Sequence, residues 1–425
     1  MPKLAINGGL PVRGRPFPVP YQNIGNEEKE AVMKVLDKKV LSQFLGEWSP
    51  DFYGGENVQQ LEKDWSRYFK IKHSVSVNSA TSGLNIAVGA AGISPGDEVI
   101  VSPYTMTASA TAALVYGGIP VFADIDPEIF CITPESIRAC ITPCTRAIIV
   151  VDLFGHPADM KEIMEIAREH DLVVIEDAAQ APGATYDGRY AGTLGDIGVY
   201  SLNVHKTIQC GEGGIVVTDN DDFAERLQLI RNHAEVVVKE KGVKNLVNMV
   251  GFNYRMTEIE AAISREQLKK LESLHKPRIY AAAYLTKNLS TIEGITTPVT
   301  KKNVRHGFYV FAIRYNQTLH KLSRNKIVAA LKAEGVPIDG GYVEPIYLEP
   351  LYQNKIAFGK DGFPFTYEGY KGTLKYNKGL CPVTERMHYN EVMTTNICHA
   401  NISREDLDDV LNAFEKVFNN LEELK

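Results

Sequence analysis

Lys206 stands in a polar turn between two apolar, β-branched runs in the stretch VYSLNVHKTIQCGEGGIVVTD. The two runs, VYSLNV and GIVVTD, are typical of strands. Three glycines, Gly211, Gly213 and Gly214, follow the lysine and would let the backbone turn tightly and re-enter the sheet. A lone lysine in such a turn is ordinarily a solvated side chain. Its chemistry therefore depends on the groups that the fold brings to it.

A carboxylate is predicted at the end of a second strand, 29 residues before the lysine (206 − 177 = 29). Asp177 follows four apolar or acidic strand residues in VVIEDAAQ, and a buried carboxylate is costly unless a cation or a hydrogen-bond donor meets it. The alternative is a helix cap or a loop contact. Gln180 lies three residues further on, and Ser201 lies five residues before the lysine. Because ligands of open α/β sheets bind at the carboxyl ends of strands, we expect these side chains to face one site.

Residues 78–83, NSATSG, form a junction of small residues between a predicted strand and a predicted helix. A helix N-terminus with small side chains, here including Thr81 and Ser82, offers free N–H groups and a favourable dipole to an anion such as phosphate. The alternative is an ordinary Ser/Thr cap.

A phosphate cup, a strand-end aspartate and a lysine, in this chain order, are what pyridoxal phosphate (PLP) needs. The aldehyde requires a lysine for a Schiff base, the pyridine nitrogen requires a carboxylate that keeps it protonated, and the phosphate requires a helix N-terminus. The three groups together indicate a PLP site.

From about residue 56 the sequence alternates helix and strand patterns. Runs such as AIIVV and LVVIE are apolar on both faces, as expected of a parallel sheet covered by helices. Strands are predicted in HSVSVNSA, DEVIVSP, PVFADID, RAIIVVDLFG and LVVIEDAAQ, and helices in NVQQLEKDWSRYF, TSGLNIAVGAAGI, TASATAALVYGGI and DMKEIMEIAREHD. The pattern predicts a doubly wound α/β domain of about 250 residues with right-handed crossovers.

The C-terminal third reads as a smaller α+β domain. The long stretch EIEAAISREQLKKLESLHKPRIYAAAYLTKNL predicts a helix pair broken at Pro277. A strand (GFYVFAIRY), a helix (RNKIVAALKAEG), a loop region rich in Gly, Pro and Tyr over 339–365 and a final helix (REDLDDVLNAFEKVF) follow it. We place a large domain with an N-terminal arm at 1–270 and a small C-terminal domain at 271–425.

Composition narrows the class of protein. The net charge of -6 argues against a nucleic-acid-binding surface, which is normally basic. No stretch approaches the roughly 20 apolar residues of a membrane span, and the N-terminal residues lack the apolar core of a signal peptide. The six cysteines suggest reduced thiols, and their spacing indicates no metal site. We expect a soluble cytoplasmic protein without nucleic-acid or membrane partners.

Motifs over nearly the whole chain resemble those of the DegT/DnrJ/EryC1/StrS family of PLP-dependent sugar and cyclitol aminotransferases. They include FYGGENVQQLEKDWSRYF, NSATSGLNIAVGAAGISPGDEVIVSPYT, DLFGHPADM, VIEDAAQAPGATYDGRYAGTLGDIGVYSLNVHK, GEGGIVVTD and GFNYRMTEIEAAISREQLKKLE. The resemblance implies the α/β scaffold of fold-type I PLP-dependent transferases, with a large doubly wound, mostly parallel sheet domain and a smaller C-terminal α+β domain.

The resemblance also implies roles for individual residues. Lys206 would be the Schiff-base lysine, Asp177 the partner of the pyridine nitrogen, and Gln180 a contact of the ring hydroxyl. The phosphate would be bound by hydroxyls of Thr81, Ser82 and Ser201. Asn253 of FNYRM is similar to the asparagine that reaches the phosphate from a neighbouring subunit, which implies a homodimer with shared active sites.

The sequence departs from the family pattern at three places. Ala80 stands where a glycine is usual, and Met106 stands where an aromatic ring usually stacks on the cofactor; a methionine sulfur can also pack on a ring. Dehydratase relatives replace the lysine with histidine. Here His205 is adjacent, but Lys206 keeps the six-residue spacing to Glu212 of GEGG (212 − 206 = 6), which favours transamination.

The predicted activity is transfer of an amino group from L-glutamate or L-glutamine, through a Lys206 Schiff base, to a keto-sugar or a cyclitol ketone. The alternative within the fold is a PLP-dependent sugar dehydratase. A non-catalytic regulator that binds the cofactor is a third reading, which the near-complete motif set disfavours. An NAD-dependent enzyme is disfavoured because GEGG precedes a strand, whereas a dinucleotide-binding GxGxxG precedes a helix.

Substrate-binding residues are the least determined part of the sequence. GGYVEPIYLEPLY, with Tyr342, Glu344 and Tyr347, resembles a substrate-facing loop, although loop tyrosines also serve as packing. Arg255 would pair a substrate carboxylate or brace its own loop. The opening INGGLPVRGRPFP resembles the leader of relatives acting on cyclitols and aminobenzoate-pathway ketones more than that of nucleotide-sugar enzymes. Whether the acceptor carries a nucleotide stays open at this point.

Overall fold

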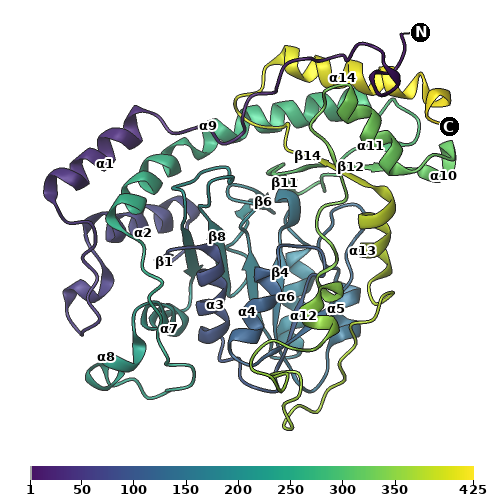
Figure 1. Cartoon of the computed structure of the whole chain (residues 1–425). Helices are drawn as coiled ribbons and strands as arrows, with labels where there is room; N and C mark the ends of the chain where they lie inside the picture. Colours follow the sequence, from purple (N-terminus) through teal and green to yellow (C-terminus); the bar gives the residue numbers. More distant parts are fainter. Residues whose placement is uncertain (1) are drawn as a thin grey trace.

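A seven-stranded sheet lies at the centre of the protein in a computed structural model that describes residues 2–425 (Figure 1). In sheet order the strands are β1 (His73–Val77), β9 (Gly214–Thr218), β8 (Ile197–Ser201), β5 (Val173–Asp177), β4 (Thr145–Val151), β2 (Glu98–Val101) and β3 (Ile119–Phe122). The five strands from β8 to β3 run parallel, and β9 runs antiparallel to both β8 and β1. The prediction of a mostly parallel sheet is confirmed.

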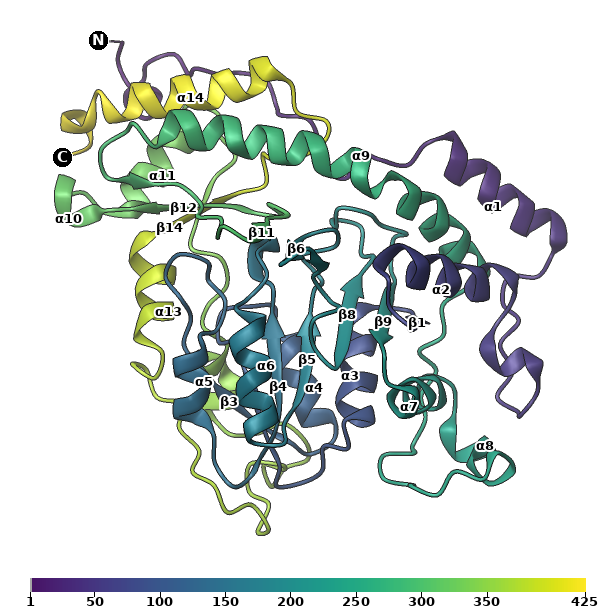
Figure 2. The same cartoon turned by 180° about the vertical axis from the view of Figure 1, so that it is seen from behind.

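Helices cover both faces of this sheet (Figure 2). One face packs against α3 (Ala80–Ala90), α4 (Ala108–Val115) and α7 (Asp221–Arg231). The other face packs against α2 (Glu56–Phe69), α5 (Pro134–Cys140) and α6 (Met160–Glu169). Strand β4 shows the cause, since Ile149 joins the first apolar layer and Ile148 and Val150 join the second. A strand apolar on both sides needs helices on both sides, as the sequence indicated.

The two strands that flank Lys206 are β8 and β9, which pair with Ser201 opposite Gly214. The glycines after the lysine serve different purposes. Gly211 has a φ of +92°, which favours glycine. A Cβ on Gly214 would lie 2.8 Å from the backbone nitrogen of Ala80, so glycine is needed where β9 passes under the start of α3.

The predicted helix pair over EIEAAISREQLKKLESLHKPRIYAAAYLTKNL is wrong, because these residues form one helix, α9 (Glu258–Leu289). Pro277 lies inside it and removes one N–H donor. Apolar packing on both sides of the proline holds the helix together. Leu268 and Leu271 join the core under α2, and Leu285 joins the C-terminal core. Tertiary burial thus overrides a local helix-breaking signal.

A four-stranded antiparallel sheet organises the C-terminal part, in the order β10-β12-β14-β13. Its elements are β10 (Ile295–Thr296), β12 (Phe311–Tyr315), α10 (Gln317–His320), α11 (Arg324–Ala333), β13 (Asp339–Gly340), β14 (Val392–Thr395) and α14 (Arg404–Phe418). The predicted strand GFYVFAIRY and the predicted helices RNKIVAALKAEG and REDLDDVLNAFEKVF correspond to β12, α11 and α14. This core also buries Leu4 from the N-terminus, which lies beside α14 (Figure 1).

The remaining elements lie outside the seven-stranded sheet, the four-stranded sheet and the helices described above. They are α1 (Asn26–Lys38), α8 (Ala234–Lys241), α12 (Pro350–Gln353), α13 (Pro382–Arg386) and the small sheet β11 (Val304–Arg305), β6 (Thr185–Tyr186) and β7 (Arg189–Tyr190). Tyr347, Tyr352 and Tyr376 of the C-terminal part pack into the core of the large sheet. A boundary at residue 270 would fall within α9, and the domain division stays a proposal. Across residues 2–425, none of the helices combines the length and apolar character needed to cross a bilayer.

Candidate active site

Lys206 lies five residues beyond the end of β8 (206 − 201 = 5), and its side chain is partly buried. Its N–H donates to the carbonyl of Asn203 at 2.9 Å, which closes the turn. The ammonium nitrogen Nζ lies 4.6 Å from the ring centroid of Tyr309. Burial lowers the pKa of Lys206 to about 8, and the negative charge of Asp177 acts in the opposite direction. A larger fraction of the Lys206 amine is therefore neutral near physiological pH than for an ordinary lysine.

Asp177 ends β5, the strand next to β8, and is only 4% exposed. The hydroxyl of Ser109 in α4 donates to its Oδ2 at 2.8 Å, and the N–H of Ala179 donates to its Oδ1 at 3.1 Å. Burial raises the pKa of Asp177, while these hydrogen bonds and the charge of Lys206 act to lower it. Within residues 2–425 no lysine or arginine forms a salt bridge with this carboxylate. A buried carboxylate of this kind favours a cationic ligand.

Gln180 links the large sheet to the C-terminal part. Its Oε1 accepts a hydrogen bond from the N–H of Phe154 at 2.8 Å, and its Nε2 donates to the hydroxyl of Tyr342 at 3.1 Å. The rings of Phe154 and Tyr342 pack edge to face at 5.0 Å. The structure therefore brings Tyr342 beside Gln180 and supports the prediction that it faces the site. Sequence reasoning named Tyr342 but gave no reason to pair it with Gln180.

The N-terminus of α3 bears on the two alternatives that the sequence left open, a serine cap and a helix end that binds an anion. Ser79 caps the helix by accepting the N–H of Ser82 at 3.1 Å, and the hydroxyl of Ser82 donates to Asn78 at 2.6 Å. Thr81 is exposed in the first turn. Ser201, at the end of β8, is buried, and its hydroxyl accepts the N–H of Asn203 at 3.3 Å. A cap by Ser79 leaves this helix end able to meet an anion through Thr81.

Met106 and Asn253 of FNYRM lie at exposed positions. Met106 is 56% exposed ahead of α4, and its sulfur accepts the N–H of Ala108 at 3.1 Å. Asn253 is exposed, and its Oδ1 accepts a hydrogen bond from Arg255 at 2.8 Å. Arg255 also reaches Asn232, at 3.4 Å. In this chain Arg255 braces its own loop, which is one of the two readings that the sequence left open.

Glu344 and Tyr347 are not brought to Lys206 by any contact in the described chain. Glu344 is exposed and accepts a hydrogen bond from Tyr389 at 3.0 Å. Tyr347 is fully buried, and its hydroxyl donates to Glu385 and accepts the N–H of Cys381. The role of Tyr347 here is packing in the core of the large sheet.

Ser109 is a site residue that sequence reasoning missed. It lies 68 residues before Asp177 and contacts it only because α4 packs beside β5. No motif around Ser109 distinguishes it from the other small residues of TMTASAT. Tyr309 was missed for the same reason, since only the fold places it over Lys206.

Comparison with known proteins bears on this geometry. Residues 23–415 match the DegT/DnrJ/EryC1/StrS aminotransferase family. The chain belongs to this family. It is an aminotransferase, and its fold is that of fold-type I transferases, as the motifs implied.

Three similar proteins illustrate the range of the DegT/DnrJ/EryC1/StrS family. The GDP-perosamine synthase of Caulobacter vibrioides is 34% identical over 77% of this chain and 85% of its own length. The L-glutamine:2-deoxy-scyllo-inosose aminotransferase of Streptomyces kanamyceticus is 31% identical over 98% of this chain and 96% of its own. The X-ray structure of an aminotransferase from Psychrobacter cryohalolentis aligns with a TM-score of 0.82 and 28% identity, covering 96% of this chain and all of that one.

Proposed function

We propose that the protein transfers an amino group from L-glutamate or L-glutamine to the ketone of a keto-sugar or cyclitol, with PLP as its cofactor and Lys206 as the attachment point. The observation that carries the proposal is the pairing of two groups at adjacent strand ends. Burial lowers the pKa of Lys206 to about 8, and the negative charge of the buried Asp177 acts on the same amine. A structural ion pair would instead bond the two groups directly, and no such bond is present in residues 2–425.

The residues present fit PLP. When bound, PLP supplies an electron sink for the carbanion that forms at the Cα of the amino-acid donor. Asp177, buried without a salt-bridge partner in residues 2–425, would hold the protonated ring nitrogen, and Gln180, three residues further along the chain, would meet the ring hydroxyl. Met106 would pack on the ring. The phosphate would be held at the start of α3 by Thr81 and Ser82, together with Ser201. In the proposed homodimer, Asn253 would reach it from the partner subunit.

Lys206 would also move the proton that transamination requires. Its free amine would take the proton from the Cα of the donor and would deliver it as a general acid later in the reaction. A pKa of about 8 suits both tasks, because an acid or base works best with a pKa near the working pH. Ser109 fixes Asp177 and so acts as a positioning residue.

The relatives support both classes of acceptor. The name of the Caulobacter protein refers to a GDP-linked sugar, and that of the Streptomyces protein refers to a free cyclitol ketone and L-glutamine. A dehydratase of the same fold is the rival function. The retained Lys206 argues against it, and formation of a dehydrated sugar without any amino donor would favour it.

An absorption spectrum of the PLP-loaded protein tests the proposal. We expect a visible band from PLP on Lys206 that L-glutamate or L-glutamine bleaches by conversion to the pyridoxamine form. A keto-sugar or keto-cyclitol should then restore the band. Absence of a band after addition of PLP would overturn the cofactor assignment, and a band that neither donor bleaches would overturn the aminotransferase half-reaction.

The homodimer with shared sites is part of the proposal. Exposed apolar side chains gather on α1 and near α8, which Figures 1 and 2 place on the same side of the molecule, beyond β1. They are Met33, Leu36, Val40, Leu41, Val236, Leu246, Val247 and Val250, each at least 44% exposed. Exposed apolar surface of this kind marks association sites. Light scattering should give twice the chain mass, and a monomer mass would contradict the shared site.

The lowered pKa of Lys206 predicts how PLP capture depends on pH. Only the neutral amine attacks the aldehyde of PLP. The rate at which cofactor-free protein captures PLP should therefore rise with pH and reach half its limit at a pH of about 8. An unperturbed lysine would give a midpoint near 10.4. In Asp177→Asn the midpoint should fall, because the carboxylate charge raises the pKa of Lys206. Stopped-flow absorbance at constant ionic strength measures both, and a midpoint above 10 in the parent protein would contradict the prediction.

A further inference from the structure

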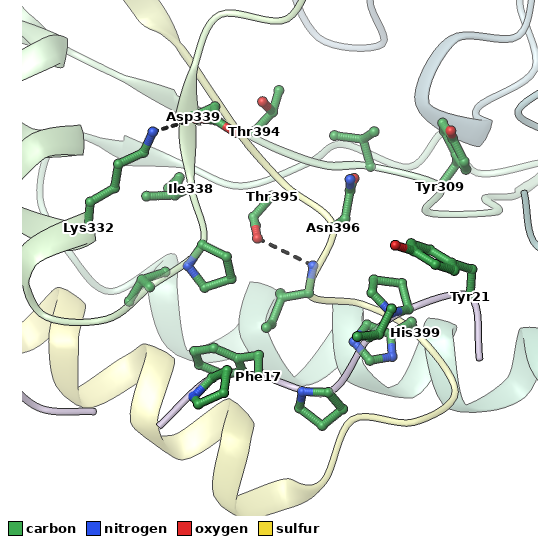
Figure 3. A pocket seen from close by; sticks show the side chains of 18 of the residues that line it. Phe17, Tyr21, Tyr309, Lys332, Ile338, Asp339, Thr394, Thr395, Asn396 and His399 are labelled. Carbon is green, nitrogen blue, oxygen red and sulfur yellow. Dashed lines mark hydrogen bonds and ion pairs between the residues drawn. The ribbon is translucent and has the colours of Figure 1, made fainter. Parts of the chain in front are cut away.

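A cavity of about 880 Å³ lies between the N-terminal segment 16–21 and the C-terminal sheet (Figure 3). Its size is that of a small-molecule site. Apolar side chains form most of its walls: Pro16, Phe17, Pro18, Val19, Pro20, Val310, Val336, Pro337, Ile338 and Ile397.

The N-terminal wall is held firmly in place. Arg13 forms salt bridges with Asp406 at 2.8 Å and Asp409 at 2.6 Å, and its guanidinium lies 3.9 Å from the ring centroid of Phe17. The N–H of Arg13 donates to the carbonyl of Glu334 at 3.0 Å. Because Arg13 is buried and its charge is paired, it fixes the position of segment 16–21, which forms one wall of the cavity.

Two tyrosines that line the cavity also contact residues of the Lys206 site. Tyr309 lines it, and its ring lies 4.6 Å from the Nζ of Lys206. Tyr342 also lines it, and its hydroxyl accepts the hydrogen bond from Gln180. The cavity therefore adjoins the Lys206 site, with Tyr309 and Tyr342 between them.

The charges around the cavity do not suit a phosphate-bearing ligand. Among the described lining residues, Lys332 is the only lysine or arginine, and it is paired with Asp339 at 2.5 Å. Burial lowers the pKa of His399 to about 4, and its Nδ1 accepts the N–H of Asn401, so its ring is neutral. A diphosphate would need cationic partners here.

The cavity also has uncharged polar side chains, among them those of Tyr21, Tyr309 and Asn396. In Figure 3, Tyr21 and Tyr309 lie toward the right of the view and Asn396 near its centre, whereas Lys332, paired with Asp339, lies toward the left. Hydroxyl and amide groups of this kind bind ligand hydroxyls, and the apolar walls can cover the C–H faces of a ring.

We propose that this cavity binds the amino acceptor, and that the acceptor is an uncharged polyhydroxylated ring ketone of the cyclitol type, without a nucleotide diphosphate. The assignment rests on the proposed function, since it takes the ketone to be aminated at Lys206. The N-terminal segment would thereby be a specificity element, with Tyr21 and Asn396 binding ring hydroxyls.

Calorimetry on the PLP-loaded protein with scyllo-inositol, which carries ring hydroxyls but no ketone, tests the site without relying on turnover. We expect binding by the parent protein and about tenfold weaker binding by Tyr21→Phe and by Asn396→Ala, the loss expected for one hydrogen bond. Tyr280→Phe is the matched control, because it removes a hydroxyl from an exposed tyrosine on α9 outside the cavity. Its affinity should equal that of the parent.

The donor half-reaction separates failure of this inference from failure of the proposed function. The amino donor should bleach the band of the parent protein, and bleaching should be unchanged in Tyr280→Phe. The concentration of 2-deoxy-scyllo-inosose that half-restores the band should rise about tenfold in Tyr21→Phe. No binding of scyllo-inositol by the parent, equal affinities in the two cavity variants and the parent, or preference for a nucleoside-diphosphate keto-hexose would overturn the inference. Loss of bleaching in the parent itself would instead overturn the aminotransferase proposal, and calorimetry would still report on the cavity.

Discussion

Lys206→Ala should lower kcat for transamination by about 10⁴-fold, because general acid–base catalysis alone contributes up to that factor. Alanine removes both the attachment point of PLP and the only group assigned to carry the proton. The variant should still bind PLP through Asp177 and the start of α3, but without the absorption band that depends on the lysine. Steady-state assays and absorption spectra of the purified variant measure the two effects.

His205→Ala is the matched control for this substitution. His205 is the neighbour of Lys206, is exposed, and lies in the same turn. Its replacement should leave kcat within about threefold of the parent, since surface substitutions rarely disturb the fold. Parent-like turnover by Lys206→Ala would refute the assignment of Lys206. A large loss in His205→Ala would show that the turn itself, and not the amine, limits the reaction.

Asp177→Asn should lower kcat by roughly 10²–10³-fold, if the carboxylate holds the ring-nitrogen pKa two to three units higher than an amide does, at a factor of ten per unit. The amide keeps the shape and the hydrogen bond with Ser109 but loses the negative charge. The ring nitrogen then loses its proton at assay pH, and the cofactor becomes a weaker electron sink. Single-turnover bleaching by L-glutamate measures the step directly.

Asp196→Asn provides a carboxylate control, because Asp196 directly precedes β8 and contacts the same strand, β5. Asp196 accepts the N–H of Val174 at 2.8 Å, at the amino end of β5, whereas Asp177 lies at the carboxyl end. We expect Asp196→Asn to lower the stability of the protein and to leave kcat unchanged. If both variants lost activity equally, loss of structure in β5 would explain the effect, and the electronic role of Asp177 would be refuted.

The chemistry at the strand ends could be predicted from the sequence because it depends on local order. Asp177 directly follows a strand that is apolar on both faces, and Lys206 follows a strand whose partner begins with glycines. Strand and turn patterns are short-range signals, and the rule that ligands bind at carboxyl strand ends converts them into a site. The mostly parallel sheet and the helices on both its faces followed from the same periodicities.

Other features depend on contacts between distant segments and left no local signal. Ser109 reaches Asp177 only after α4 packs on the sheet. Pro277 predicts a helix break, but apolar packing on both sides keeps α9 intact. Tyr347 occurs in a loop typical of substrate contacts, yet it is fully buried in the core. In each case tertiary burial decided the outcome.

The unbroken helix α9 limits how the active site can open. It has 32 residues and is about 48 Å long, at 1.5 Å per residue. It contacts α1 and α2 toward one end and α14 toward the other (Figure 2). If the C-terminal sheet moved away from the large sheet, α9 would have to bend or lose those contacts. The tyrosines of the C-terminal part that are buried in the core of the large sheet would also become exposed. The large sheet and the C-terminal sheet should therefore stay together as one unit during ligand exchange.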